Sequence, residues 1–169
     1  EMLQNSFDAV KGAIEKGKLS AGKIDITADA LARTIAVKDN GLGMSADVLA
    51  NQFLQLAGTS KESERSSGGL GIAKGLFLYG NQSIVVTTTR DGVTSILDTT
   101  GTELMEAAND PTKQININTE KTGKESGTTV TVTTPENYVD PTTGETIKID
   151  IPEYYANYEV LKYSPMFAN

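Results

Sequence analysis

The sequence contains no cysteine and no histidine, and both absences restrict its chemistry. Without cysteine, it has no disulfide framework and no thiolate metal site. Without histidine, the usual side chain for proton transfer near neutral pH is missing. Acid–base catalysis by this chain would therefore depend on carboxylates or lysines.

Positive charge is also scarce, because 15 Lys and Arg residues face 22 Asp and Glu residues and the net charge is −7. Direct binding of DNA or RNA requires a basic surface, so we do not expect it of this domain. A nucleotide is a different case. Mg²⁺, backbone amides and a few lysines can neutralise a buried triphosphate on an acidic protein.

Long apolar runs are absent as well. No run in the sequence approaches the roughly 18 residues that a membrane-spanning helix needs, and the N-terminus does not resemble a signal peptide. We therefore expect no membrane association and a cytoplasmic location. A chain of 169 residues with 38% hydrophobic content is long enough to bury one sizeable core, which predicts a single main domain.

Residues 1–16 show the spacing of an amphipathic helix. At about 100° per residue, Glu1, Asn5, Asp8 and Gly12 fall within an arc of roughly 60°. The opposite side carries Leu3, Phe7, Val10 and Ile14. A row of carboxylate and amide oxygens suits Mg²⁺ and an activated water. The alternative is an ordinary helix whose exposed face is acidic.

A predicted strand over 34–38 leads directly into Asp39, Gly41, Gly43 and Met44. The glycines allow positive φ and close approach of a ligand, and Asp39 provides an acceptor at the end of the strand. Ser45 is a typical N-cap for a helix over 46–56.

The segment 58–75 is rich in hydroxyls and glycines and leads into a helix over 70–79. Backbone N–H groups at such a helix start can bind phosphate. Taken singly, glycine pairs of this kind more often mark plain turns.

In this order and spacing, the motifs resemble the ATPase superfamily of DNA gyrase B, the ninety-kilodalton heat-shock chaperone, sensor histidine kinases and MutL, whose ATP site is the Bergerat fold. The motif Glu-x-x-x-Asn-x-x-Asp-Ala is matched at 1–9, Asp-x-Gly-x-Gly at 39–43, and the glycine-rich lid at 68–71. Residues 58–61 resemble the phosphate-contacting segment of MutL-like members, and 127–132 resemble a late strand whose threonine, here Thr128, helps to recognise adenine.

The resemblance assigns roles to these residues. Glu1 would be the general base for the attacking water, Asn5 would bind Mg²⁺, and Asp39 would accept a hydrogen bond from the adenine amino group. Guanine presents a carbonyl at that edge and would be rejected. Asp8 would orient Asn5 or a water. The phosphates would be surrounded by residues of the lid and of the segment before it: Thr59, Ser60, Lys61, Gly68, Gly69, Leu70, Gly71 and Lys74. Lys61 and Lys74 fit solvated surface charge equally well.

The predicted architecture is a two-layer α/β (α+β) sandwich in which helices over 1–16, 46–56 and 70–79 cover one face of a mostly antiparallel sheet. Strands are expected at 23–27, 34–38, 83–89, 93–98, 114–118 and 128–134, and Asp91-Gly92 marks a hairpin turn. Residues 1–134 would form the ATP-binding domain. Because family members normally have residues before the first motif, we expect this chain to be part of a longer protein.

Residues 135–169 hold four of the five prolines and five of the six tyrosines. We interpret this segment as a closing hairpin and tail folded onto the domain and leading to a further domain. The alternative is a tyrosine-rich contact with a neighbouring domain or partner.

Three functions remain open. The first is a Mg²⁺-dependent ATPase in which lid closure drives conformational change or homodimerisation of a larger protein, as in gyrase, MutL and the chaperone. The second is the ATP-binding domain of a protein histidine or serine kinase. Histidine kinases usually lack an acid at the position of Glu1, so Glu1 favours hydrolysis, although serine-kinase anti-sigma factors carry a similar residue. The third is a nucleotide-binding module without turnover.

Overall fold

The computed structural model describes residues 2–51, 82–139 and 143–148. Predictions that fall on residue 1 or on 52–81, 140–142 and 149–169 lie outside this part. The described elements are α1 (Met2–Glu15), β1 (Ile24–Asp29), β2 (Thr34–Asp39), a helical segment at 46–51, β3 (Ser83–Arg90), β4 (Val93–Thr99), α4 (Gly101–Asn109), β5 (Ile117–Lys121), β6 (Gly127–Thr133), β7 (Asn137–Val139) and β8 (Thr146–Lys148).

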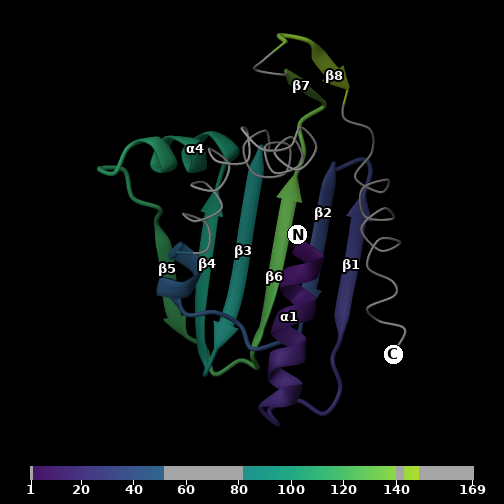
Figure 1. The fold of residues 1–169 in the computed structure, drawn as a ribbon, viewed down its shortest axis with the longest axis vertical. Coiled ribbons are helices and arrows are strands. Elements are labelled where there is room, and N and C mark those ends of the chain that lie inside the picture. The colour runs from purple at the N-terminus through teal and green to yellow at the C-terminus, as the bar shows by residue number, and fades with distance from the viewer. Residues whose placement is uncertain (1, 52–81, 140–142, 149–169) are drawn as a thin grey trace.

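A six-stranded sheet in the order β1-β2-β6-β3-β4-β5 forms the centre of the fold. All neighbouring strands in it are antiparallel, and α1 lies across one face, over β6 and β2 (Figure 1). The predicted α+β class, with helices on an antiparallel sheet, is therefore confirmed. The late strand β6 lies between β2 and β3, so it brings together the ends of strands that are distant in the sequence.

The β3–β4 hairpin is confirmed at its predicted turn. Asp91 and Gly92 both adopt positive φ, 51° and 77°. A two-residue turn of this kind matches the right-handed twist of its flanking strands, and Asp-Gly is one of the few dipeptides that tolerate it. The turn fixes the register that pairs Arg90 with Val93.

Apolar side chains form rows across the covered face of the sheet. Val37, Val130, Val86 and Leu97 are successive register partners on β2, β6, β3 and β4. The core cluster consists of Leu49, Ile84, Val86, Leu97 and Leu104. Leu49 comes from the helical segment 46–51, where the backbone N–H of Leu49 donates to the Ser45 carbonyl at 3.0 Å. The predicted helix start after Ser45 is thus confirmed.

The buried face of α1 differs from the predicted one. Leu3 and Val10 are buried as expected, but their buried neighbours are Ser6 and Ala13, while Ile14 is 44% exposed. The buried positions recur at spacings of three and four residues, as in any helix packed along one stripe. Small side chains on this stripe permit a close approach to the sheet. The hydrophobic pattern of the sequence thus predicts a buried stripe that is rotated by part of a helical turn from the observed one.

Two further elements differ from the predictions. α4 is not among the predicted helices. At its start, the Thr100 hydroxyl accepts from the Glu103 backbone N–H at 3.1 Å, and the Glu103 carboxylate accepts from the Thr100 N–H at 3.1 Å. This capping box was the available signal. The strand predicted at 114–118 is β5, at 117–121. As an exposed edge strand, β5 pairs through polar residues that give no apolar alternation.

β7 and β8 form a separate two-stranded hairpin, with Asn137 paired to Lys148. The hairpin predicted after Thr134 is therefore present, and it projects beyond the end of β6 (Figure 1). Whether the remaining tail folds back on the domain stays a prediction. Within the ranges that the structure describes, none of the helices has the length and apolar character needed to cross a membrane.

Candidate functional site

The last residue of β2, Asp39, is a buried carboxylate with only 6% of its surface exposed. Its Oδ1 accepts a hydrogen bond from the Gly41 backbone N–H at 2.9 Å. A buried acid costs free energy unless hydrogen-bond donors compensate it. Its position at the end of a central strand, facing the helical layer, is typical of a ligand-binding group rather than of a surface charge.

The glycine loop, residues 40–44 after Asp39, packs tightly between α1 and β3. The Leu42 N–H donates to the Ala9 carbonyl of α1 at 3.3 Å. A Cβ on Gly41 would lie 2.6 Å from the Ala9 carbonyl carbon, and one on Gly43, which has φ of +67°, would lie 1.8 Å from the Thr89 carbonyl oxygen. Both glycines are therefore required by close backbone contacts, and Gly43 also by its φ.

A polar row crosses the sheet at the level of Asp39. Asp39, Thr128, Thr88 and Ser95 are successive register partners on β2, β6, β3 and β4. All four side chains are buried, between 0% and 8% exposed. The hydroxyls of Thr88 and Thr128 lie 2.8 Å apart, and the Met44 N–H donates to Thr88 Oγ1 at 2.8 Å.

The structure thus brings together five of the predicted site residues: Asp39, Gly41, Gly43, Met44 and Thr128. It adds two that sequence reasoning missed, Ser6 and Thr88. The signal for Ser6 was weak, because a serine beside a motif asparagine has no diagnostic spacing. Thr88 was hidden in the run 87–89, where every residue is a threonine and nothing marks the inward-facing position.

On α1, the predicted polar edge borders the glycine loop. Ala9 contacts Gly41 and Leu42, and a Cβ on Gly12 would lie 3.1 Å from the Leu42 side chain. Asn5, one turn before Ala9, is exposed, as is Asp8. Asn5 is therefore on the loop-facing edge and remains accessible, as a metal-binding amide requires.

Burial raises the pKa of the Asp39 carboxyl above its ordinary value of 3.8. Hydrogen bonds from the Gly41 backbone, the Ser6 side chain and the Thr128 backbone oppose this shift, because they favour the carboxylate. Desolvation is the larger effect. Burial therefore makes the charged form of Asp39 unfavourable, and a hydrogen-bond donor on a ligand would stabilise this carboxylate.

This shift predicts a pH-dependent stability. Because the folded-state pKa of Asp39 lies above the unfolded value, its contribution to the free energy of unfolding decreases as the pH rises through the window between them. We expect Asp39→Asn to gain stability relative to the parent across this window and to keep that gain at higher pH. Urea unfolding of both proteins over the acidic range measures the difference. Parallel pH profiles would show that Asp39 has no raised pKa.

Other predicted site residues lie outside the described part of the chain. They are Glu1, Thr59, Ser60, Lys61, Gly68, Gly69, Leu70, Gly71 and Lys74. Within the described part, no cluster of three or more His, Cys, Asp or Glu side chains could hold a metal ion. The amide of Asn5 remains the metal ligand that the motif predicts there.

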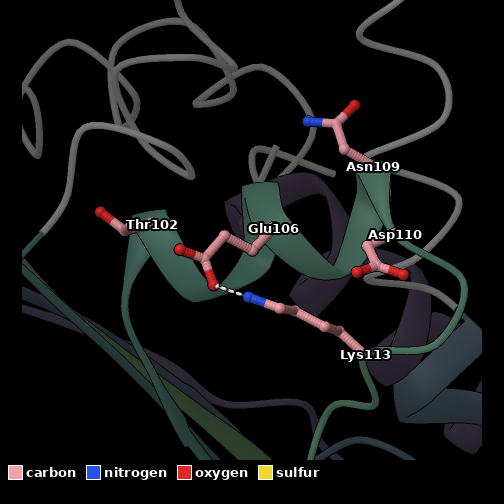
Figure 2. Close-up of a pocket in the computed structure, with 5 residues that line it drawn as sticks. All are labelled: Thr102, Glu106, Asn109, Asp110 and Lys113. Carbon is pink, nitrogen blue, oxygen red and sulfur yellow. Dashed lines mark hydrogen bonds and ion pairs between the residues drawn. The ribbon is translucent and has the colours of Figure 1, made fainter.

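A hollow of about 290 Å³ lies beside α4 and is lined by Thr102, Glu106, Asn109, Asp110 and Lys113 (Figure 2). Its only cation among these residues, Lys113, is paired with Glu106 at 2.5 Å. The carboxylates of Glu106 and Asp110 would repel phosphate. This hollow therefore does not compete with the Asp39 row as a nucleotide site.

Comparison with known proteins agrees with the geometry. No curated protein matches the chain. The profile of the family described as histidine kinase-, DNA gyrase B- and HSP90-like ATPases matches residues 1–128, a range that contains α1, the glycine loop, β3 and Thr128. This match covers most of the chain. With the antiparallel sheet under α1 and the buried Asp39 at the end of β2, it shows that the chain belongs to the histidine kinase-, DNA gyrase B- and HSP90-like ATPase family.

Proposed function

We propose that this domain binds Mg·ATP and hydrolyses it by attack of water on the γ-phosphate, with Glu1 as the general base and Asn5 as a Mg²⁺ ligand. The observation that carries the proposal is the buried Asp39 carboxylate in a polar row with Thr128. A purine amino group would donate to this carboxylate and relieve part of its desolvation cost.

Hydrolysis is favoured over phosphotransfer to a histidine because of Glu1. An acid at this position can accept the proton of an attacking water, whereas a kinase whose nucleophile is a histidine needs no such base. Closing of the segment 58–75 over the triphosphate would then drive conformational change or homodimerisation of a larger cytoplasmic protein. Lys61 or Lys74 would add charge beside the phosphates.

Calorimetric titration tests nucleotide binding directly. ATP with Mg²⁺ should bind more tightly than ATP with a chelator, and GTP should bind much more weakly than ATP. Release of inorganic phosphate, measured under saturating Mg·ATP, then separates an ATPase from a binding module. Transfer of the labelled γ-phosphate to protein, with no free phosphate released, would instead assign the domain to a kinase.

The segment 58–75 gives a separate prediction. It contains few apolar side chains and many hydroxyls and glycines, so contacts with the γ-phosphate would account for most of its order. We expect trypsin to cleave after Lys61 and Arg65 more slowly when a non-hydrolysable ATP analogue is bound. Cleavage after Lys121, at the end of the exposed edge strand β5, serves as the internal control. Equal protection by ADP would show that the γ-phosphate is not the group that this segment contacts.

A further inference from the structure

Thr88 lies in the middle of the polar row, where its hydroxyl makes three close polar contacts. It is 0% exposed. Its Oγ1 accepts from the Met44 N–H at 2.8 Å, lies 2.8 Å from Thr128 Oγ1, and lies 3.4 Å from the Gly127 carbonyl. A valine would fill the same space without these contacts. The hydroxyl therefore has a role that a β-branched apolar side chain could not fill.

Counting hydrogens leaves two arrangements for the Thr88–Thr128 hydrogen bond. A backbone N–H can only donate, so Met44 occupies a lone pair of Thr88 and leaves the single Thr88 hydrogen for another acceptor. Two acceptors are within reach, Thr128 Oγ1 at 2.8 Å and the Gly127 carbonyl at 3.4 Å. If Thr88 donates to the Gly127 carbonyl, Thr128 donates to the second lone pair of Thr88. If Thr88 instead donates to Thr128, at the shorter distance, Thr128 keeps its own hydrogen for another acceptor.

In the second arrangement, the hydrogen of Thr128 is available to a ligand. Among the described residues, Thr128 Oγ1 has no hydrogen-bond partner besides Thr88 Oγ1. Its register partner Asp39 presents an acceptor on the adjoining strand. The two side chains thus offer one donor and one acceptor next to each other.

We propose that Thr88 is a positioning residue for base recognition, and that it orients the Thr128 hydroxyl as a donor toward purine N1 while Asp39 accepts from the 6-amino group. This inference rests on the proposed function, since it assumes an adenine nucleotide beside Asp39. Adenine has an acceptor at N1 and a donor at its 6-amino group. Guanine has the reverse pattern and would meet Thr128 and Asp39 with the wrong groups.

Two ligand analogues isolate the contacts. In 1-deaza-ATP, a C–H replaces N1, and in purine riboside triphosphate a hydrogen replaces the 6-amino group. The parent protein should bind both more weakly than ATP. Thr88→Val should bind ATP and purine riboside triphosphate about 3- to 10-fold more weakly than the parent does, the range of one lost neutral hydrogen bond. Its affinity for 1-deaza-ATP should equal the parent's.

Matched variants control for packing. Thr88→Ser keeps the hydroxyl and should bind ATP as the parent does. Thr87→Val makes the same chemical change on the same strand, at the half-buried neighbouring position, and should also leave ATP affinity unchanged. Thermal unfolding of each variant checks the fold. If Thr88→Val does not fold, Thr88→Cys replaces it, since a thiol is a poorer donor of similar size.

Several outcomes would overturn the proposal. A Thr88→Val protein that loses equal affinity for ATP and 1-deaza-ATP would give Thr88 a purely structural role. A parent that binds 1-deaza-ATP as tightly as ATP would show that N1 receives no hydrogen bond, whatever the variants do. These results differ from failure of the proposed function, in which the parent would show no preference for ATP over GTP.

Discussion

The Glu1→Ala variant is expected to hydrolyse ATP roughly 10²–10⁴ times more slowly than the parent, which is the usual effect of removing a general base. Its affinity for Mg·ATP should stay nearly unchanged, because Glu1 is assigned to the attacking water and not to the nucleotide. Single-turnover hydrolysis and calorimetry on the same preparation measure the two quantities. The assay belongs in the full-length protein, because the proposed function couples turnover to homodimerisation.

Asn5→Ala provides the contrast. Asn5 follows Glu1 by four residues in the sequence. It lies on the edge of α1 that borders the glycine loop, and it is assigned to the metal. Its loss should weaken binding of Mg·ATP and leave metal-free ATP binding unaffected. Glu15→Ala, at the exposed far end of α1 beside Lys11, is the matched control and should change neither quantity.

A parental hydrolysis rate in Glu1→Ala would make that acid structural and favour the kinase or the binding module.

The second large effect is expected at Asp39. Asp39→Asn removes a charged acceptor and places an amide N–H₂ near the adenine amino group, so ATP affinity should fall by about 1.5–3 kcal/mol. This is roughly a 10- to 100-fold increase in Kd. Preference for ATP over GTP should fall with it. Calorimetry with both nucleotides, on the parent and on the variant, gives the comparison.

The unliganded variant should be at least as stable as the parent. The asparagine oxygen can still accept from the Gly41 N–H, and the desolvation cost that raises the Asp39 pKa disappears. Loss of binding with retained or raised thermal stability would therefore separate a ligand role from a folding role. Asp25→Asn on β1, where Asp25 is exposed and paired with Lys23 at 3.3 Å, is the control. Unchanged ATP affinity in Asp39→Asn would refute the base-recognition assignment.

Local sequence determined the parts of this protein whose geometry depends on neighbouring residues. The Asp91-Gly92 turn needs two positive φ angles in succession, so its dipeptide alone predicted the β3–β4 hairpin. Asp39, Gly41 and Gly43 likewise identified a strand end followed by a tightly packed loop. Their spacing reflects contacts within the loop itself and contacts with α1. The α1 residues that make these contacts belong to the same set of motifs.

Tertiary structure decided which strands became neighbours. β6 pairs with both β2 and β3, although it follows them by many residues, and this pairing alone places Thr128 beside Asp39 and Thr88 beside Thr128. Periodicity gives a strand its two faces but not its partners, since strand order depends on the packing of all strands together. The same reason explains Ser6 and Ile14. Helical spacing indicated that α1 has a buried stripe, and contact with the sheet determined which residues form it.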